Sequence, residues 1–89
     1  MRVYLKVKGL VQGIGYRYFV IQTAQKLSLS GWVRNCSNGD VECEAQGSEK
    51  NLKDFFAFLE NGHSWARIDK IQHEAISEKA NEIGFEVRY

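Results

Sequence analysis

Three scarcities in the sequence narrow the classes of protein that it can encode. Its two cysteines, Cys36 and Cys43, are too few for a disulfide-rich scaffold and lack the Cys-x-x-Cys spacing of zinc and redox sites. No apolar run approaches the roughly 18 residues that a membrane-spanning helix needs. The amino terminus alternates between polar and apolar residues instead of forming a signal-peptide core. We therefore expect reduced thiols and a soluble, cytoplasmic protein without a membrane partner.

An excess of either charge is also missing. Twelve Lys and Arg residues stand against eleven Asp and Glu residues, and the formal net charge is +1. Nucleic-acid-binding proteins normally carry a basic stripe, because contacts to phosphate supply most of their affinity. The even mixture of charges predicts no nucleic-acid partner. The 89 residues are enough for a single domain, residues 1–89, and we expect a monomer at this size.

The hydrophobic pattern of the first half predicts strands and a helix in alternation. Residues 2–8 alternate as in a half-buried strand, whereas residues 17–29 carry apolar side chains at helical spacing. Two further strands, 31–36 and 40–46, flank Ser37-Asn38-Gly39. A short polar segment that ends in Asn-Gly is a strong hairpin signal.

The second half repeats the helix and the strand. Ser48 is a suitable N-cap for a second helix that Asn61-Gly62 would end, and another strand begins near Ala66. A polar connection, residues 77–82, leads to a short terminal strand around Phe85 and Val87. This order predicts a split βαβ fold of the α+β class, in which an antiparallel sheet carries two helices on one face. Such a fold hosts many functions and therefore identifies none of them.

The segment between the first strand and the first helix is the one that suggests chemistry. Gly9, Gly13 and Gly15 allow its backbone amides to converge on an anion, and amides at a helix start carry partial positive charge. Arg17 adds a planar cation that can hold two phosphate oxygens. The alternative is a tight connection followed by a solvated arginine. The spacing fits neither a Walker A motif nor a dinucleotide-binding motif, so we predict a site for one compact phosphoryl group.

Two motifs resemble those of the acylphosphatase family. Residues 11–17, Val-Gln-Gly-Ile-Gly-Tyr-Arg, are similar to its signature loop, and residues 31–35, Gly-Trp-Val-Arg-Asn, to its second motif. The resemblance covers nearly the whole chain and is strongest over residues 9–47. It implies a ferredoxin-like βαββαβ sandwich, with the short extra strand at its C-terminus, and hydrolysis of acyl phosphates. Arg17 matches the family's phosphate-binding arginine, and Asn35 its water-orienting asparagine.

The resemblance also implies which residues form the phosphate cradle: Gln12, Gly13, Ile14, Gly15 and Tyr16. An acyl phosphate releases a carboxylate, which is a good leaving group, so a general acid is not essential. Direct attack by a positioned water then needs orientation and charge stabilisation, with inorganic phosphate as product and inhibitor. We expect no metal and no cofactor. His63 and His73 are ten residues apart without a third ligand nearby, which is typical of surface histidines.

Three alternatives stay open at this point. The chain could be a non-catalytic, phosphate-binding or regulatory domain of the same fold. An RNA-recognition domain would need aromatic residues on its central strands within a basic face, and Glu42 and Glu44 oppose that. The chain could also be an acylphosphatase-like domain embedded in a carbamoyl-transfer enzyme. The start and finish of the sequence favour a free-standing enzyme that acts on small-molecule acyl phosphates.

Overall fold

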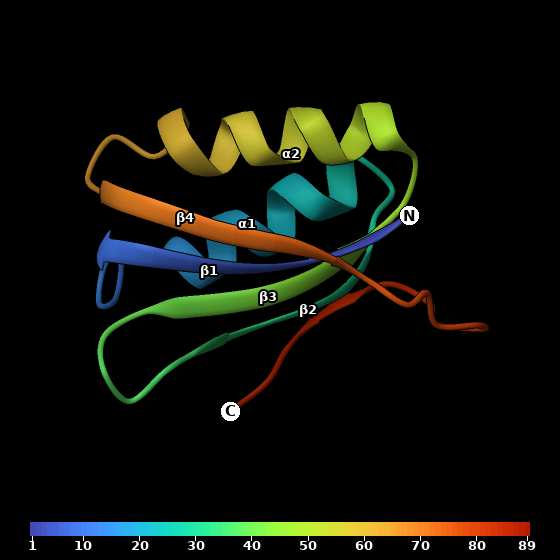
Figure 1. Cartoon of the computed structure of the whole chain (residues 1–89). Helices are drawn as coiled ribbons and strands as arrows, with labels where there is room; N and C mark the ends of the chain where they lie inside the picture. The colour runs from blue at the N-terminus through green and yellow to red at the C-terminus, as the bar shows by residue number, and fades with distance from the viewer.

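Five strands form one sheet, and both helices pack on the same face of it (Figure 1). The computed structural model describes residues 1–89. The strands are β1 (Arg2–Leu10), β2 (Ser30–Asn35), β3 (Val41–Gln46), β4 (Arg67–Ile76) and β5 (Phe85–Val87), and the helices are α1 (Tyr16–Lys26) and α2 (Glu49–Asn61). The predicted α+β sandwich of ferredoxin-like type is confirmed.

The strand order across the sheet is β4-β1-β3-β2-β5. The first four strands pair antiparallel, as predicted, whereas β5 runs parallel to β2 and places Phe85 beside Gly31. This exception follows from the topology. Because β4 and β5 lie at opposite edges, the connection between them has to cross the whole sheet. β4 ends at the end of the sheet where β2 begins. The chain therefore enters β5 from that same end and runs in the same direction as β2.

The first helix and the first strand differ most from their predicted bounds. The predicted helix 17–29 ends at Lys26, because Ser28 adopts a positive φ of 55° and the Leu29 amide donates to the Ala24 carbonyl at 2.9 Å. That geometry closes the last turn and directs the chain into β2. β1 extends to Leu10 rather than Lys8, since its pairing with β4 continues beyond an irregularity at Lys8.

The hairpin between β2 and β3 forms where the sequence predicts it. The Cys36 amide donates to the Asp40 carbonyl at 2.8 Å, and the Gly39 amide donates to the Cys36 carbonyl at 3.2 Å. Gly39 has a φ of 99°, a conformation that suits glycine. Cys36 and Cys43 are both free thiols.

The core lies between the sheet and the helices. Alternate residues of β1 and β3 point to the helices, among them Leu5, Val7 and Cys43. From α2, Phe55 and Leu59 meet them and are almost fully buried. Each large apolar side chain contributes about 1.5–3 kcal/mol when it leaves water. This core fixes the end of β1, from which the glycine-rich loop departs.

The other face of the sheet is polar, and a buried arginine organises one end of it. Arg2 is only 1% exposed. Its Nε donates to Glu44 Oε1 at 2.8 Å and its Nη1 to Glu82 Oε1 at 2.6 Å. Glu82 belongs to the connection between β4 and β5, so this contact fastens that connection to the sheet. The hydrogen bond from Arg2 lowers the pKa of Glu82, against the opposing effect of partial burial.

We predict that Glu82→Gln lowers the free energy of unfolding by about 1 kcal/mol at neutral pH, because a neutral acceptor bonds Arg2 more weakly than a carboxylate. The folded-state pKa of Glu82 lies below its unfolded value of about 4.3. Its stabilisation is therefore present above that pH and is lost as the pH falls through the folded value. Urea denaturation at several pH values should show the difference from wild type shrinking in acid.

Glu60→Gln is the matched control, since Glu60 is exposed and has no ion-pair partner. A Glu82→Gln difference that stayed constant from neutral pH to about pH 3 would show that the ion pair does not stabilise the fold.

Candidate active site

The glycine-rich loop joins the inner strand β1 to α1. The first residue of this loop, Val11, is buried in the core, with 1% of its surface exposed. Gly13 and Gly15 both have a φ of 78°, and a Cβ at either position would meet no other atom. Glycine is therefore favoured there by the left-handed backbone and not by a lack of space. Gly15 is the N-cap of α1, and no side chain caps the first amides of the helix. These donors are available to an anion.

Tyr16 is an anchor for the loop rather than a wall of the site. Its side chain is almost fully buried, and its hydroxyl donates to the Leu59 carbonyl at 2.8 Å. Its ring packs beside Phe19 and His63, and Ile14 is partly buried against the same core. Burial raises the pKa of the Tyr16 hydroxyl, so this group stays protonated. Of the predicted cradle, Ile14 and Tyr16 can offer their backbone amides to a ligand while their side chains hold the loop in place.

Gln12 turns its side chain toward the hairpin. Its Nε2 donates to the Cys36 carbonyl at 2.8 Å and to the Asp40 carbonyl at 2.9 Å. These two carbonyls flank the turn that directly follows β2. The loop and the hairpin turn are thus connected through a single side chain.

Arg17 lies in the first turn of α1 with its guanidinium unpaired. Four arginines each contact a carboxylate: Arg2, Arg34, Arg67 and Arg88. Arg17 has neither an ion pair nor a side-chain hydrogen bond, and the ring of Tyr89 lies 5.4 Å from its Cζ. A ring over one face of a guanidinium leaves its N–H groups free, since these point outward in the plane of the group. Arg17 therefore remains able to bind an anion.

Asn35 ends β2 at the same end of the sheet. In register, Asn35 pairs with Val41, which in turn pairs with Val7 of β1. The end of β2 and the loop that follows β1 therefore lie close together (Figure 1). Asn35 Oδ1 is buried and has no hydrogen-bond partner. A buried acceptor without a donor is costly, and its natural partner is a water or a ligand N–H or O–H.

The position of Tyr89 was not predicted from the sequence. The Arg88 amide donates to the Val33 carbonyl at 2.8 Å, which continues the parallel pairing of β5 with β2. Tyr89 consequently lies alongside the end of β2, where its ring can reach Arg17. A lone aromatic residue far along the chain gives no sequence signal for this contact, because the contact depends on the strand order.

The two histidines lie in different surroundings. His73 is exposed, as predicted, and its ring lies nearly perpendicular to that of Phe56, with the two centroids 5.3 Å apart. His63 is instead half-buried beside Phe19, and its Nδ1 accepts a hydrogen bond from the Trp65 amide at 3.2 Å. The prediction of a surface residue is therefore only partly right for His63. No group of three or more His, Cys, Asp or Glu residues is placed to hold a metal ion.

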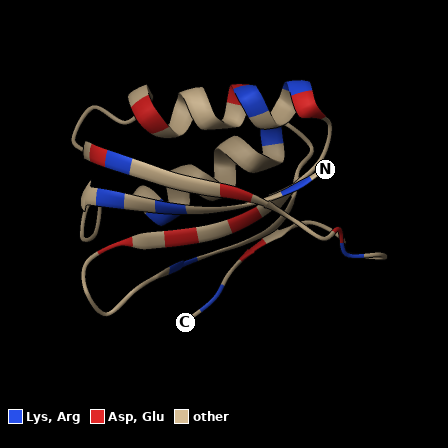
Figure 2. Ribbon diagram, in the orientation of Figure 1, with Lys and Arg blue, Asp and Glu red and all other residues tan.

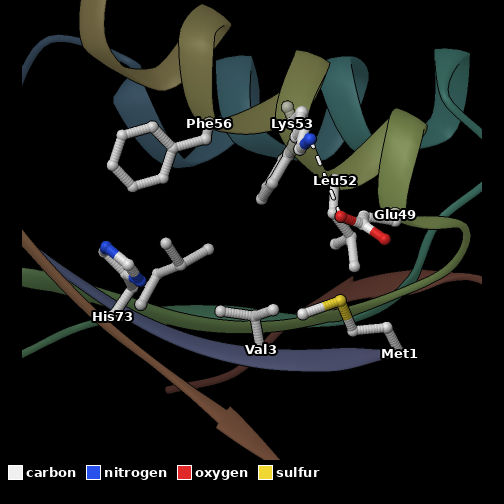
Figure 3. A pocket seen from close by; sticks show the side chains of 9 residues that line it. Met1, Val3, Glu49, Leu52, Lys53, Phe56 and His73 are labelled. Carbon is white, nitrogen blue, oxygen red and sulfur yellow. Dashed lines mark ion pairs between the residues drawn. The ribbon is translucent and has the colours of Figure 1, made fainter.

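A separate hollow lies elsewhere, between α2 and the first half of β1 (Figure 3). It is a groove of about 300 Å³ with mainly apolar walls, among them Val3 and Phe56. Its one lysine, Lys53, already contacts Glu49 at 3.6 Å. An apolar groove whose cation is paired does not suit a phosphoryl group, so we place the candidate site at the loop.

Fold and loop together define a class of protein: a ferredoxin-like sandwich with a candidate anion site between a strand and a helix. Comparison with known proteins identifies the family. A sequence model of the acylphosphatase family matches residues 3–87. The acylphosphatase of Moorella thermoacetica is 42% identical over 90 residues, covering 99% of this chain and 94% of that protein. The chain belongs to the acylphosphatase family.

Solved structures agree with this assignment. The crystal structure of acylphosphatase from Bacillus subtilis has a TM-score of 0.93 and 34% identity, covering 99% of this chain and 98% of that one. Full-length HypF, in a phosphate- and nucleotide-bound form, matches with a TM-score of 0.84 and 31% identity. The match covers 99% of this chain but 12% of HypF. The same fold therefore occurs both alone and within a larger chain.

We predict that Arg17→Ala weakens binding of inorganic phosphate by about 10- to 100-fold, because charge-assisted hydrogen bonds contribute roughly 1.5–3 kcal/mol. Arg17→Lys should recover little, since an ammonium cannot hold two oxygens in one plane. Isothermal titration of phosphate, with sulfate as a second anion, measures the effect.

Arg67→Ala is the control, because Arg67 is exposed and already paired with Asp69. A folded Arg17→Ala protein that binds phosphate as tightly as the Arg67→Ala protein would move the anion site away from the loop.

Proposed function

We propose that this protein hydrolyses carboxyl-phosphate anhydrides to a carboxylate and inorganic phosphate. The observation that carries the proposal is that two groups lie at the same end of the sheet. One is an unpaired cation, Arg17, and the other is a buried acceptor without a hydrogen-bond partner, Asn35 Oδ1. The first can bind the phosphoryl group, and the second can orient a water. Membership of the acylphosphatase family supports the same activity.

The loop amides and Arg17 would bind the phosphoryl oxygens. Phosphoryl transfer passes through a loose transition state with charge spread over these oxygens, so fixed donors around them lower the barrier. Donors in place before the substrate arrives need no rearrangement during the reaction. The anchors at Val11 and Tyr16 serve this purpose.

Asn35 would accept a hydrogen bond from the attacking water. The water oxygen forms a bond to phosphorus as the bond between phosphorus and the bridging oxygen breaks. The bridging oxygen leaves as part of the carboxylate, and one proton of the water passes to phosphate or solvent. A neutral amide can orient the water without placing a negative charge beside the substrate.

The remaining parts of the proposal concern context. We propose small-molecule acyl phosphates as substrates, phosphate as an inhibitory product, and a monomeric, single-domain enzyme that works in the cytoplasm without a cofactor or a nucleic-acid partner. Basic and acidic residues are interspersed along the ribbon of residues 1–89, which supports the absence of a nucleic-acid partner (Figure 2). No helix is long and apolar enough to cross a membrane.

A second candidate function is phosphate binding without turnover, as a module of a larger protein. The match to a small part of full-length HypF supports this second candidate, because it shows the same fold within a larger chain. Hydrolysis of acetyl phosphate by the purified chain separates the two candidates, since a binding module would take up phosphate but release no acetate.

We expect that hydrolysis to survive exhaustive treatment with EDTA, because Arg17 and the loop amides supply the positive charge that a metal ion supplies elsewhere. Release of phosphate from acetyl phosphate is followed before and after chelation. Activity that is lost with EDTA and restored by a divalent ion would contradict the mechanism.

For Asn35→Ala we expect a fall in turnover of about two orders of magnitude, because an unoriented water rarely lies in line for attack. Phosphate affinity and the melting temperature should stay near wild type. Asn35→Asp should also be poor, since a carboxylate repels the substrate. Steady-state kinetics, phosphate titration and thermal melting are measured together.

Asn61→Ala is the matched control, because Asn61 is exposed at the end of α2. If Asn35→Ala lost phosphate binding or stability in parallel with turnover, Asn35 would be structural and the water would be oriented by another group.

A further inference from the structure

The side chain of Gln12 has no donor left for a ligand. A glutamine amide nitrogen carries two hydrogens. In Gln12 both are used, one on the Cys36 carbonyl at 2.8 Å and one on the Asp40 carbonyl at 2.9 Å. The polar atom that remains, Oε1, is an acceptor and would repel a phosphate oxygen. The family resemblance placed Gln12 in the phosphate cradle, yet in this arrangement only its backbone amide could contact phosphate.

The two acceptors are the carbonyls that close the hairpin turn. The Asp40 carbonyl also receives the Cys36 amide, and the Cys36 carbonyl also receives the Gly39 amide. Asn38 stiffens the same turn, because its Oδ1 accepts from the Asp40 amide at 3.1 Å. Gln12 therefore holds a turn that is already well bonded, and Asn35 is the residue directly before it.

A second polar contact, which joins the end of β1 to the turn, is much weaker than the hydrogen bonds of Gln12. Lys8 Nζ lies 3.6 Å from Asp40 Oδ2, and the lysine side chain is 42% exposed. Exposed ion pairs contribute little and hold no fixed geometry. Gln12 thus supplies the side-chain hydrogen bonds that join the loop to the turn after β2.

We infer that Gln12 is a positioning residue that aligns the phosphoryl group in the loop with the water on Asn35. The inference rests on the proposed function. Phosphate would be bound by the loop amides and Arg17, and the water by Asn35. The side chain of Gln12 would touch neither reactant but would fix the distance and angle between the two groups that do. Such a residue should influence the rate of the chemical step more than the binding of phosphate.

A double-mutant cycle tests this role. In Gln12→Ala, kcat for acetyl phosphate should fall at least tenfold, while the inhibition constant of inorganic phosphate stays within about twofold of wild type. Once Asn35 is replaced by alanine there is no oriented water to misalign. In the Asn35→Ala background, removal of Gln12 should therefore lower kcat by less than about threefold. Thermal melting of all four proteins shows that they are folded.

Gln12→Glu provides a second variant of almost the same shape. Its carboxylate would face two carbonyls and repel them at neutral pH. As the pH falls toward the ordinary carboxyl pKa of about 4.3, the introduced side chain becomes protonated and regains one donor. The ratio of variant to wild-type kcat should rise as the pH is lowered. Gln72→Ala is the control, since Gln72 is exposed on β4 and makes no side-chain hydrogen bond.

Three results would overturn the inference. A phosphate inhibition constant that rises in proportion to the loss of kcat would make Gln12 a phosphate ligand. An equal loss of kcat in both backgrounds, or a Gln12→Ala kcat equal to that of Gln72→Ala, would remove the alignment role. Failure of the proposed function gives a different outcome, because wild type itself would then release no acetate from acetyl phosphate.

Discussion

The proposed site depends on a cation, Arg17, that no carboxylate of the chain contacts. Arg17 can hold an anion only if no carboxylate of the chain reaches it first. The acids of the central strand β3 have other partners: Glu42 receives the hydroxyl of Tyr4 and the guanidinium of Arg34, and Glu44 receives Arg2. The first turn of α1 contains no acidic residue. The other four arginines contact carboxylates, so Arg17 is left unpaired in a chain whose net charge is only +1.

The glycine-rich loop shows how much of such a site can be predicted from sequence. Gly13, Gly15 and Arg17 are recognisable because backbone conformation and permanent charge depend on residue type and local order. Asn35 was found through a motif resemblance, and its buried, unpartnered oxygen adds a physical reason. Its proximity to the loop follows from strand register, which the hydrophobic pattern restricts but does not determine.

Three features of the structure could not be predicted from the sequence, each for a different physical reason. Tyr89 reaches Arg17 only because β5 joins the sheet at β2, and an alternating pattern of three residues does not say which edge they join. The two hydrogen bonds of Gln12 go to backbone carbonyls, which every residue possesses, so no side chain marks the partner. The early end of α1 at Lys26 depends on a left-handed Ser28, a conformation that serine rarely signals.

The double pairing of β1 has a consequence for the motions of the molecule. Residues 2–7 are bonded to β3 on one side and to β4 on the other, so this strand can open only when the whole sheet opens. Such strands exchange their amide hydrogens most slowly, whereas loop amides without partners exchange fast. The boundary between the two regimes lies near Val11, where the chain leaves the sheet and enters the loop. The amide hydrogens that exchange fastest in this region therefore belong to a loop that continues directly from the strand that exchanges slowest. The loop donors can thus be exposed to solvent while the strand before them holds their backbone in place.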